Sequence, residues 1–240
     1  MFKKYHYILL LVTVFQFFSC SENSTEPKDE GTVTDIDKNV YKTVKIGDQW
    51  WMAENLKVTH YRNGDAIPTV TDDSTWTVLT EGAYCAYGND NGNVDTYGLL
   101  YNWYTVDDSR RIAPEGWHVP SNEEWKQLEM YLGLSQNEAN STGMRGTDEG
   151  GKLKMEGTEY WNNPNIGANN SIGFSALPGG YRTSDGRFDS KGQFAFFWTS
   201  IQPDSNTSWY RVLYYNSSDI RRFSNNNLRG CGYSVRCVKD

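Results

Sequence analysis

Apolar and polar residues alternate in the first clearly patterned segment of the chain. Residues Val40–Ile46 read Val-Tyr-Lys-Thr-Val-Lys-Ile, the pair Gly47-Asp48 follows, and Gln49–Met52 read Gln-Trp-Trp-Met. A period of two is typical of a half-buried strand, and a Gly-Asp pair between two such runs indicates a tight turn. The pattern therefore predicts a β-hairpin near the start of the folded domain.

A second segment has the period of an amphipathic helix. Ser121 is a good N-cap, and Glu124 stands three residues later, where it completes a capping box. The apolar residues Trp125, Leu128 and Leu132 follow at spacings that place them on one helix face. We expect this helix to end near Gly133.

The remaining apolar segments predict short strands separated by long loops. Residues 98–104 fit a helix and a buried strand equally well. Residues 174–177, 194–199 and 209–214 predict core strands, and the alternation over 233–238 predicts a half-buried last strand. Residues 134–172 are rich in Gly, Asn and Ser and show little periodicity. The sequence as a whole predicts a single α+β domain with short strands, one or two helices and long loops.

The N-terminus has the pattern of an export signal. Lys3 and Lys4 precede an apolar run over residues 7–18, which is too short for an ordinary membrane span, and Ser19-Cys20 follows. The last residues of this run resemble a bacterial lipobox, although Phe17 stands where Leu is usual. The resemblance implies that residues 1–19 form a lipoprotein signal peptide and that Cys20 is lipidated. Simple secretion is the alternative.

The segment after Cys20 is polar and predicts a tether. No apolar residue occurs between Ser21 and Gly31, so we expect a flexible linker over residues 20–36 and a folded domain over 37–240. No second long apolar segment occurs, so the lipid is the expected contact with the membrane. These features predict a protein of the bacterial outer membrane or cell surface, or a secreted or periplasmic one.

Charge excludes one class of partner. The formal net charge of the 240 residues is −7, and it becomes −9 when Lys3 and Lys4 are removed with the signal. Nucleic-acid binding needs a basic face that neutralises phosphates, so no nucleic-acid partner is expected. Nine Trp and sixteen Tyr predict instead a core rich in aromatic rings.

Three cysteines fall within the predicted domain, namely Cys85, Cys231 and Cys237. If residues 231–237 form one strand, about 20 Å separates its two thiols, which is too far for a disulfide. Cys85 is then the common partner, and we favour a disulfide between Cys85 and Cys237. A bend at Gly232 would change this pairing, and the partner of Cys231 stays open.

Six ordered sequence blocks closely resemble the Fibrobacter succinogenes major paralogous domain over about residues 40–240. The resemblance implies a cell-envelope or secreted protein, often a lipoprotein, of a family without an established biochemical activity. The blocks are residues 44–47 (Val-Lys-Ile-Gly) with 51–56 (Trp-Met-Ala-Glu-Asn-Leu), 97–104 (Tyr-Gly-Leu-Leu-Tyr-Asn-Trp-Tyr), 113–120 (Ala-Pro-Glu-Gly-Trp-His-Val-Pro), 149–154 (Glu-Gly-Gly-Lys-Leu-Lys), 173–182 (Gly-Phe-Ser-Ala-Leu-Pro-Gly-Gly-Tyr-Arg) and 234–237 (Ser-Val-Arg-Cys).

A second resemblance concerns the fold. Residues 117–120 with Glu124-Trp125, and the terminal residues 233–237, are similar to signatures of the formylglycine-generating, sulfatase-modifying domain. That domain is a variant of the C-type lectin fold, so the resemblance implies a C-type-lectin-like α+β domain. Its enzymes use a close pair of copper-binding cysteines, and no such pair occurs here. We therefore do not expect enzyme activity, and a degenerate enzyme of this type is the third-ranked hypothesis.

Catalytic and zinc-binding patterns are missing from the sequence. His60 and His118 are the imidazoles outside the signal, and we expect His118 to have a structural role beside the helix cap. No nucleophile signature and no zinc-ligand spacing accompanies them. The adjacent acids are typical of solvated turns or helix starts rather than of a glycosidase pair. These acids are Asp72-Asp73, Asp107-Asp108 and Glu123-Glu124.

Oxygen-rich loops leave calcium as the one conceivable cofactor. Residues 89–95 contain the candidate ligands Asn89, Asp90, Asn91 and Asp95, but Val94 and Leu100 break the helix-loop-helix calcium pattern. An Asn/Gly turn is the favoured interpretation. Gln202-Pro203-Asp204 matches the galactose-type tripeptide of C-type lectins, without the Trp-Asn-Asp that follows it there.

Aromatic residues in polar contexts give the leading functional hypothesis. Trp76, Trp161 and Trp209 are flanked by polar residues, and sugars stack on exposed aromatic faces. The sequence therefore predicts a non-enzymatic module that binds glycan or another surface component. A domain that recognises an envelope protein is the alternative.

Overall fold

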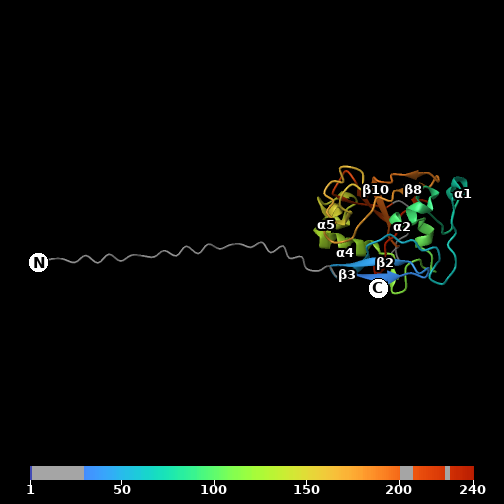
Figure 1. Ribbon diagram of the computed structural model, residues 1–240, viewed down its shortest axis with the longest axis horizontal. Coiled ribbons are helices and arrows are strands. Elements are labelled where there is room, and N and C mark those ends of the chain that lie inside the picture. The colour runs from blue at the N-terminus through green and yellow to red at the C-terminus, as the bar shows by residue number, and fades with distance from the viewer. Residues whose placement is uncertain (2–29, 201–207, 225–227) are drawn as a thin grey trace.

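The computed structural model describes the whole chain except residues 2–29, 201–207 and 225–227. The described part is a mixed α+β fold of two antiparallel sheets, short helices and long loops, which confirms the predicted class (Figure 1). Within these residues, no helix has the length and apolarity that crossing a membrane requires.

The first sheet joins the beginning of the domain to its end. Its strand order is β1-β2-β3-β13-β6, and every pairing is antiparallel. The predicted hairpin is confirmed, because β2 and β3 have the expected bounds and Ile46 pairs with Gln49 next to the turn. The C-terminus consequently lies beside this hairpin (Figure 1). The strands are β1 (Glu30–Thr34), β2 (Val40–Ile46), β3 (Gln49–Met52), β13 (Val238–Lys239) and β6 (Trp117–His118).

The second sheet has the order β10-β11-β12-β7. Its longest pairing aligns Phe194 with Tyr214 and Trp198 with Tyr210. The predicted strands over 194–199 and 209–214 are thus present, the first one residue shorter than expected. The strands are β10 (Phe194–Trp198), β11 (Trp209–Tyr214), β12 (Ile220–Ser224) and β7 (Gly143–Arg145).

Shorter elements fill the connections between the two sheets. Two small ladders pair β4 with β5 and β8 with β9. They are β4 (Tyr84–Cys85), β5 (Leu100–Tyr101), β8 (Tyr181–Arg182) and β9 (Phe188–Asp189). The helices are α1 (Asp73–Thr77), α2 (Val94–Tyr97), α3 (Trp103–Val106), α4 (Asn122–Leu132), α5 (Gln136–Asn140) and α6 (Glu149–Leu153), with 3-10 turns at Tyr87–Asn89 and Asn91–Asn93.

Helix α4 forms as its sequence predicts. Ser121 accepts a hydrogen bond from the Glu124 backbone, the Glu124 carboxylate accepts one from the Ser121 backbone, and Gly133 is the C-cap. The capping box satisfies backbone N–H groups that the first helical turn leaves without partners. The stripe of Trp125, Leu128 and Leu132 is buried, with exposed fractions of 1%, 0% and 5%.

Aromatic rings join α4 to both sheets. Trp125 contacts Trp51 of the first sheet at a ring-centre distance of 5.0 Å and Phe197 of the second sheet at 5.7 Å. Phe174, from a loop, completes the group against all three rings. Edge-on and tilted rings of this kind contribute about 0.5–1.5 kcal/mol per pair beyond their buried area. The prediction of a ring-rich core is confirmed.

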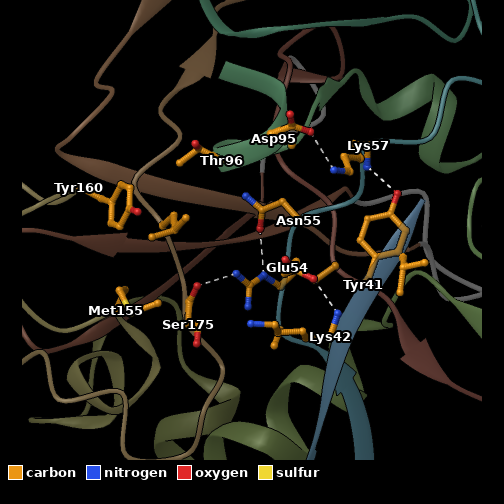
Figure 2. A pocket seen from close by; sticks show the side chains of 15 residues that line it. Tyr41, Lys42, Glu54, Asn55, Lys57, Asp95, Thr96, Met155, Tyr160 and Ser175 are labelled. Atoms are coloured by element: carbon orange, nitrogen blue, oxygen red, sulfur yellow. Dashed lines mark hydrogen bonds and ion pairs between the residues drawn. The ribbon is translucent and has the colours of Figure 1, made fainter. Parts of the chain in front are cut away.

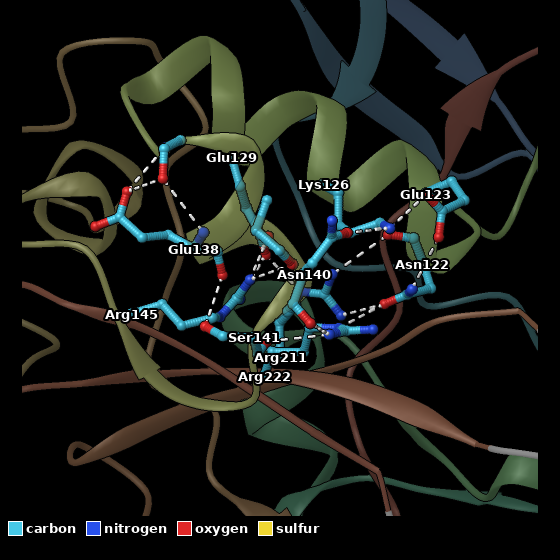
Figure 3. A network of polar contacts seen from close by, with 12 residues as sticks. Asn122, Glu123, Lys126, Glu129, Glu138, Asn140, Ser141, Arg145, Arg211 and Arg222 are labelled. Atoms are coloured by element: carbon cyan, nitrogen blue, oxygen red, sulfur yellow. Dashed lines mark hydrogen bonds and ion pairs between the residues drawn. The ribbon is translucent and has the colours of Figure 1, made fainter.

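A buried polar network also fixes α4 to the second sheet (Figure 3). Arg145, Arg211 and Arg222, from three neighbouring strands, are 3%, 0% and 5% exposed. Asn122 of α4 accepts hydrogen bonds of 3.1 Å from Arg211 and 2.9 Å from Arg222. Burial lowers the pKa of Arg211 to about 10, although the nearby Glu129 carboxylate opposes this shift. Because these groups bond to one another away from solvent, we interpret the network as structural.

The structure differs from several sequence predictions about secondary structure and settles one that was open. Residues 233–238 do not form a half-buried strand, because all six are buried and only Val238–Lys239 is regular strand. Residues 174–177 form a loop that makes one bridge at Ala176. Residues 98–104 combine both of the open alternatives, with β5 followed by α3. Among the residues that the structure describes, six α-helices replace the expected one or two, although only α4 of these exceeds five residues.

The folded domain begins before the predicted boundary at residue 37. Strand β1, Glu30–Thr34, pairs with β2 over its full length, from Glu30 opposite Val44 to Thr34 opposite Val40. The last part of the predicted tether is therefore the edge strand of the first sheet. Polar composition did not prevent strand formation here, since four of its five residues are exposed at the sheet edge. The signal peptide and Cys20 lie outside the described residues.

Candidate functional site

Two of the three tryptophans predicted to bind sugar are buried. Trp76 is 1% exposed and donates from Nε1 to the Gly230 carbonyl at 2.7 Å, and the Arg182 guanidinium lies 4.4 Å from its ring centre. Trp161 is also 1% exposed and donates to the Ala176 carbonyl at 2.9 Å. Neither ring presents a face to solvent, so the prediction of sugar stacking on them was wrong.

The third predicted tryptophan, Trp209, already has an arginine side chain stacked on its ring. Trp209 is half-buried at the start of β11, and the guanidinium of Arg222 lies 3.8 Å from its ring centre. This cation–π contact occupies one face of the ring, which is then not available to a sugar. The companion residues Gln202 and Asp204 lie outside the described residues.

The candidate calcium ligands are engaged in local structure. Asp90 accepts from the Gly92 backbone as the N-cap of a 3-10 turn, and Asn89 donates to the Thr71 carbonyl. Asp95 forms a 3.0 Å ion pair with Lys57, and Asn91 begins the turn that Asp90 caps. No three His, Cys, Asp or Glu side chains in the described part of the chain gather as a metal site would require.

The predicted disulfide between Cys85 and Cys237 is not formed. Cys85, Cys231 and Cys237 are all free and buried. Cys85 packs with Trp76 and Leu100 in one core cluster, whereas Cys231 and Cys237 belong to another. Burial raises the pKa of the Cys85 thiol to about 11 and also raises those of Cys231 and Cys237. The prediction failed because it assumed that at least one of the three cysteines forms a disulfide.

His118 has the structural role that the sequence predicted. Its Nε2 lies 2.7 Å from Glu124 of the capping box, and its Nδ1 lies 2.7 Å from Asp240. The hydrogen bond to Glu124, then that to Asp240, raises the pKa of His118 against the effect of burial. Both ring nitrogens are used, so the imidazole ties the start of α4 to the last residue of the chain.

The paired acids also serve local structure. Asp72 caps α1, and its neighbour Asp73 pairs with the buried Arg182 at 2.7 Å. Asp108 forms an ion pair with Arg110 at 2.7 Å.

A polar cleft lies between the first sheet, helix α2 and the loops that carry Tyr160 and Ser175 (Figure 2). Its volume is about 290 Å³. Glu54 and Asn55 lie at its centre in Figure 2, Lys57 and Asp95 form an ion pair on one side, and Tyr160 lies on the other. Sequence reasoning did not select these residues, because segments far apart in the chain supply them.

Arg236 forms part of the cleft and joins three of its segments. Its Nε donates to Asn55 Oδ1 at 2.9 Å, and its terminal nitrogens donate to the carbonyls of Phe174 and, at 2.9 Å, Ser175. The side chain is 1% exposed. Burial lowers its pKa to about 9, and the Glu54 carboxylate acts in the opposite direction.

One face of the second sheet carries a row of aromatic side chains, whose inner part packs against the core. We call Phe194, Phe196, Tyr210, Tyr214 and Phe223 the aromatic face. Phe194 and Tyr214 stack at 4.4 Å between ring centres with an interplanar angle of 12°. Phe196 and Tyr210 continue the row at 6.3 Å, and Tyr210 contacts Phe223 at 5.8 Å. Phe223 is 36% exposed and Tyr210 9%, and the other three are half-buried.

A hollow of about 400 Å³ continues the aromatic face. Its walls include the rings of Tyr181, Phe196, Tyr210 and Tyr233, and its edge carries Thr183, Asp185 and Arg187. Asp185 and Arg187 pair at 2.7 Å with side chains 54% and 76% exposed. A hydrogen bond from Arg187, then one from Thr183, lowers the pKa of Asp185 to about 2. The hollow therefore joins aromatic walls to an ionised, solvent-exposed edge.

The sequence profile of the Fibrobacter succinogenes major domain matches residues 44–239. The chain belongs to this family. Comparisons with curated proteins and with solved structures found no match. Three sequence blocks that indicated the Fibrobacter succinogenes major domain meet at one point, because Asn55, Ser175 and Arg236 come from different blocks and are hydrogen-bonded to one another through the Arg236 guanidinium.

Proposed function

We propose that this member of the Fibrobacter succinogenes major domain family is an exported, lipid-anchored, non-enzymatic module of the bacterial cell envelope that binds glycan. The export pattern and Cys20 support the location and the anchor. The commitment of both ring nitrogens of His118 to carboxylates supports a binding role over acid–base catalysis. The aromatic face and the adjoining hollow form the glycan-binding surface in this proposal.

The observation that carries the proposal is the combination of aromatic rings with a charged edge. Sugars present apolar C–H patches that pack on ring faces, and their hydroxyls bond to charged and polar side chains. Phe194 and Tyr214 are half-buried rings of the row, and the Arg221 guanidinium lies 5.0 Å from the ring centre of Tyr214. Asp185 and Arg187 offer an acceptor and donors beside the hollow. The surface spans three strands, so it suits several successive sugar units of a polysaccharide.

The proposal includes a C-type-lectin-like fold. Support comes from the pairing of the last strand, β13, with β3 of the opening hairpin. A second antiparallel sheet and long loops lie between these chain ends, as expected for that fold.

Recognition of an envelope protein is the second candidate function. Met144 lies on the same side of the second sheet as the aromatic face, because it pairs with Arg221. Met144 is 71% exposed. Phe223, at 36% exposed, extends this apolar edge. Exposed Met and Phe side chains are enriched in protein interfaces.

Glycan-array binding by the full-length protein, purified in mild detergent, tests the proposal. We expect saturable binding to a polysaccharide that weakens at least about tenfold in Phe194→Ala and in Tyr214→Ala, because each substitution removes one aromatic ring that contacts the sugar. Tyr131→Ala is the matched control, since Tyr131 is 62% exposed on α4, away from the aromatic face. Equal loss in all three variants would contradict the proposal.

A further variant, Met144→Ser, separates the two candidate functions when it is compared with Phe194→Ala. Saturable binding to an envelope protein that weakens in Met144→Ser, together with no glycan binding by the wild type, would favour the protein-recognition alternative. Glycan binding that is unchanged in Met144→Ser and lost in Phe194→Ala would favour the glycan module.

A further inference from the structure

The buried guanidinium of Arg236 forms no ion pair with the described residues, and the Glu54 carboxylate attracts it from beyond ion-pair distance. Three of the five N–H groups of an arginine find acceptors here, and all three acceptors are neutral oxygens of Asn55, Phe174 and Ser175. In the described part of the chain, no carboxylate lies within ion-pair distance of this guanidinium. The guanidinium also lies 4.3 Å from the ring centre of Phe174. Buried charges are normally paired, so a cation held by neutral oxygens and an aromatic ring favours an anion in the adjacent cleft.

The charges around the cleft do not cancel this cation. Lys57 is neutralised by Asp95 in their 3.0 Å pair. Lys42 and Glu54 are exposed at the cleft, and their printed contact is a 2.6 Å hydrogen bond from the Lys42 backbone to the Glu54 carboxylate. The charged side chains that line the cleft are therefore three basic and two acidic ones, namely Lys42, Lys57, Arg236, Glu54 and Asp95. The cleft thus has one net positive charge, whereas the net charge of the chain is −7.

One wall of the cleft is held in a strained conformation. Ser175 has a φ of 56°, in the left-handed region that side chains rarely adopt. Asn170 holds it there, because its Oδ1 accepts from the Ser175 backbone at 2.8 Å and its Nδ2 donates to the Ser175 hydroxyl at 2.9 Å. This conformation accompanies the hydrogen bond from the Arg236 side chain to the Ser175 carbonyl. Such strain is concentrated at ligand sites.

The size and lining of the cleft restrict the ligand. Its volume of about 290 Å³ is at the lower end of small-molecule sites, which are about 300–1,000 Å³. Tyr160 and Met155 offer an aromatic and an apolar surface, while Glu54 and Thr96 offer oxygens to hydroxyl groups. Two carboxylates at the rim would repel a ligand with two negative charges, so a single carboxylate fits better than phosphate.

We propose that this cleft is a second, separate site, which binds a small sugar acid through its carboxylate. The carboxylate is held by the N–H groups of Arg236 that have no protein acceptor and by the Lys42 ammonium. The sugar hydroxyls bond to Glu54 and Thr96, and the ring packs on Tyr160. This site lies between the first sheet and α2 and shares no residue with the aromatic face or the hollow.

Isothermal titration calorimetry on the full-length protein in detergent tests the proposal, with D-glucuronate as the probe. D-glucose has the same ring without the carboxylate, and inorganic phosphate tests a simple anion. We expect glucuronate to bind at least about tenfold more tightly than either, since its carboxylate accepts charge-assisted hydrogen bonds and its ring packs on Tyr160. Equal affinity for glucose, tighter binding of phosphate, or no glucuronate binding at millimolar concentration would overturn the proposal.

Variants locate the site without depending on Arg236 alone. Lys42→Gln and Tyr160→Ala alter the rim, and each should weaken glucuronate binding at least about fivefold while leaving the melting temperature near that of the wild type. Arg236→Lys keeps the charge but loses the paired donors, and it should abolish binding if the protein remains folded by circular dichroism. Unchanged binding in Lys42→Gln and Tyr160→Ala would overturn the assignment.

A control in the other site separates this proposal from the proposed function. Arg187→Gln and Phe194→Ala change the hollow and the aromatic face, and we expect both to keep wild-type glucuronate affinity. Loss of glucuronate binding in these two variants, with retention in the cleft variants, would place the acid at the aromatic face and refute the cleft site.

Discussion

The carboxylate of Glu129 accepts two hydrogen bonds from the guanidinium of Arg145, at 2.7 and 2.9 Å, and both side chains are 0% exposed. Arg211 donates to the same carboxylate from β11, which β12 separates from the β7 strand of Arg145. One acid on α4 therefore compensates basic groups on two strands of the second sheet. Because a buried charge without its partner is strongly unfavourable, the packing of α4 against the sheet depends on this carboxylate.

The first prediction concerns this carboxylate. Glu129→Gln keeps the shape of the side chain and removes its charge, which leaves Arg145 and Arg211 buried without an anion. We expect the free energy of unfolding to fall by about 3–5 kcal/mol, measured by urea denaturation. The matched control is Asp148→Asn, which removes an exposed pair with Lys152 and should cost no more than about 1 kcal/mol. Similar losses in the two variants would show that Glu129 does not hold the network together.

The elements that the sequence predicted correctly have local signals. The hairpin of β2 and β3 is specified by alternation on each side of Gly47-Asp48, and α4 is specified by its capping box and apolar stripe. The final segment could not be predicted in this way. Alternation indicates burial on one face only, whereas residues 233–238 are buried on both faces between core clusters.

The candidate sites were less predictable because they depend on distant segments. Polar neighbours suggested that Trp76 was exposed, yet its ring nitrogen bonds to Gly230, 154 positions along the chain. The alternation of Phe194 and Phe196 did indicate one face of a strand. Because Ala195 and Phe197 are also apolar, the pattern did not say which of the two faces is less buried. The cleft requires Asn55 and Arg236, which are 181 positions apart.

The second prediction concerns the thiols. Because Cys85, Cys231 and Cys237 are free and buried, dithiothreitol should leave the melting temperature unchanged. Burial raises the pKa of Cys85 to about 11, so this thiol is protonated at pH 8 and should react slowly with Ellman's reagent in the native protein. All three thiols should react at once in denaturant. A melting temperature that falls by several degrees in reductant, with thiols missing from the titration, would show a disulfide instead.

The third prediction concerns pH. Hydrogen bonds to Glu124 and Asp240 raise the pKa of His118 above its ordinary 6.5, so the charged imidazole is favoured by folding. This stabilisation is fully present below pH 6.5 and is lost as the pH rises through the raised value. His118→Gln should therefore lower the free energy of unfolding more at pH 5.5 than at pH 8.5. The side chain is 37% exposed, so solvent screening limits the difference to about 1 kcal/mol or less.

Urea denaturation of the wild type and His118→Gln at both pH values measures this difference. Added salt at 1 M should reduce it, because the groups involved are partly exposed. An equal effect of the substitution at pH 5.5 and pH 8.5 would mean that the charge of His118 does not stabilise the capped start of α4.

The fourth prediction concerns Gly98, which lines the cleft. Its φ is 71°, and an added Cβ would lie 2.7 Å from the Asn55 Cβ and 2.8 Å from the Leu56 carbonyl oxygen. Gly64 has a φ of 92°, and no atom lies within 4 Å of its added Cβ. Both alanine variants incur the conformational cost of a positive φ, about 1–3 kcal/mol, and it is the larger at Gly98, whose ψ of −161° essentially only glycine adopts. Gly98→Ala alone adds a steric clash, which should destabilise the protein by a further 1–3 kcal/mol or so.

Thermal and urea unfolding of the two variants compares these costs directly. Gly98→Ala should also weaken glucuronate binding, because the clash displaces Asn55, and Asn55 accepts the hydrogen bond that orients Arg236. Gly64→Ala should keep wild-type affinity. If Gly98→Ala and Gly64→Ala are equally stable, then the backbone at Asn55 yields easily, and the contact between Gly98 and Asn55 does not fix the geometry of the cleft.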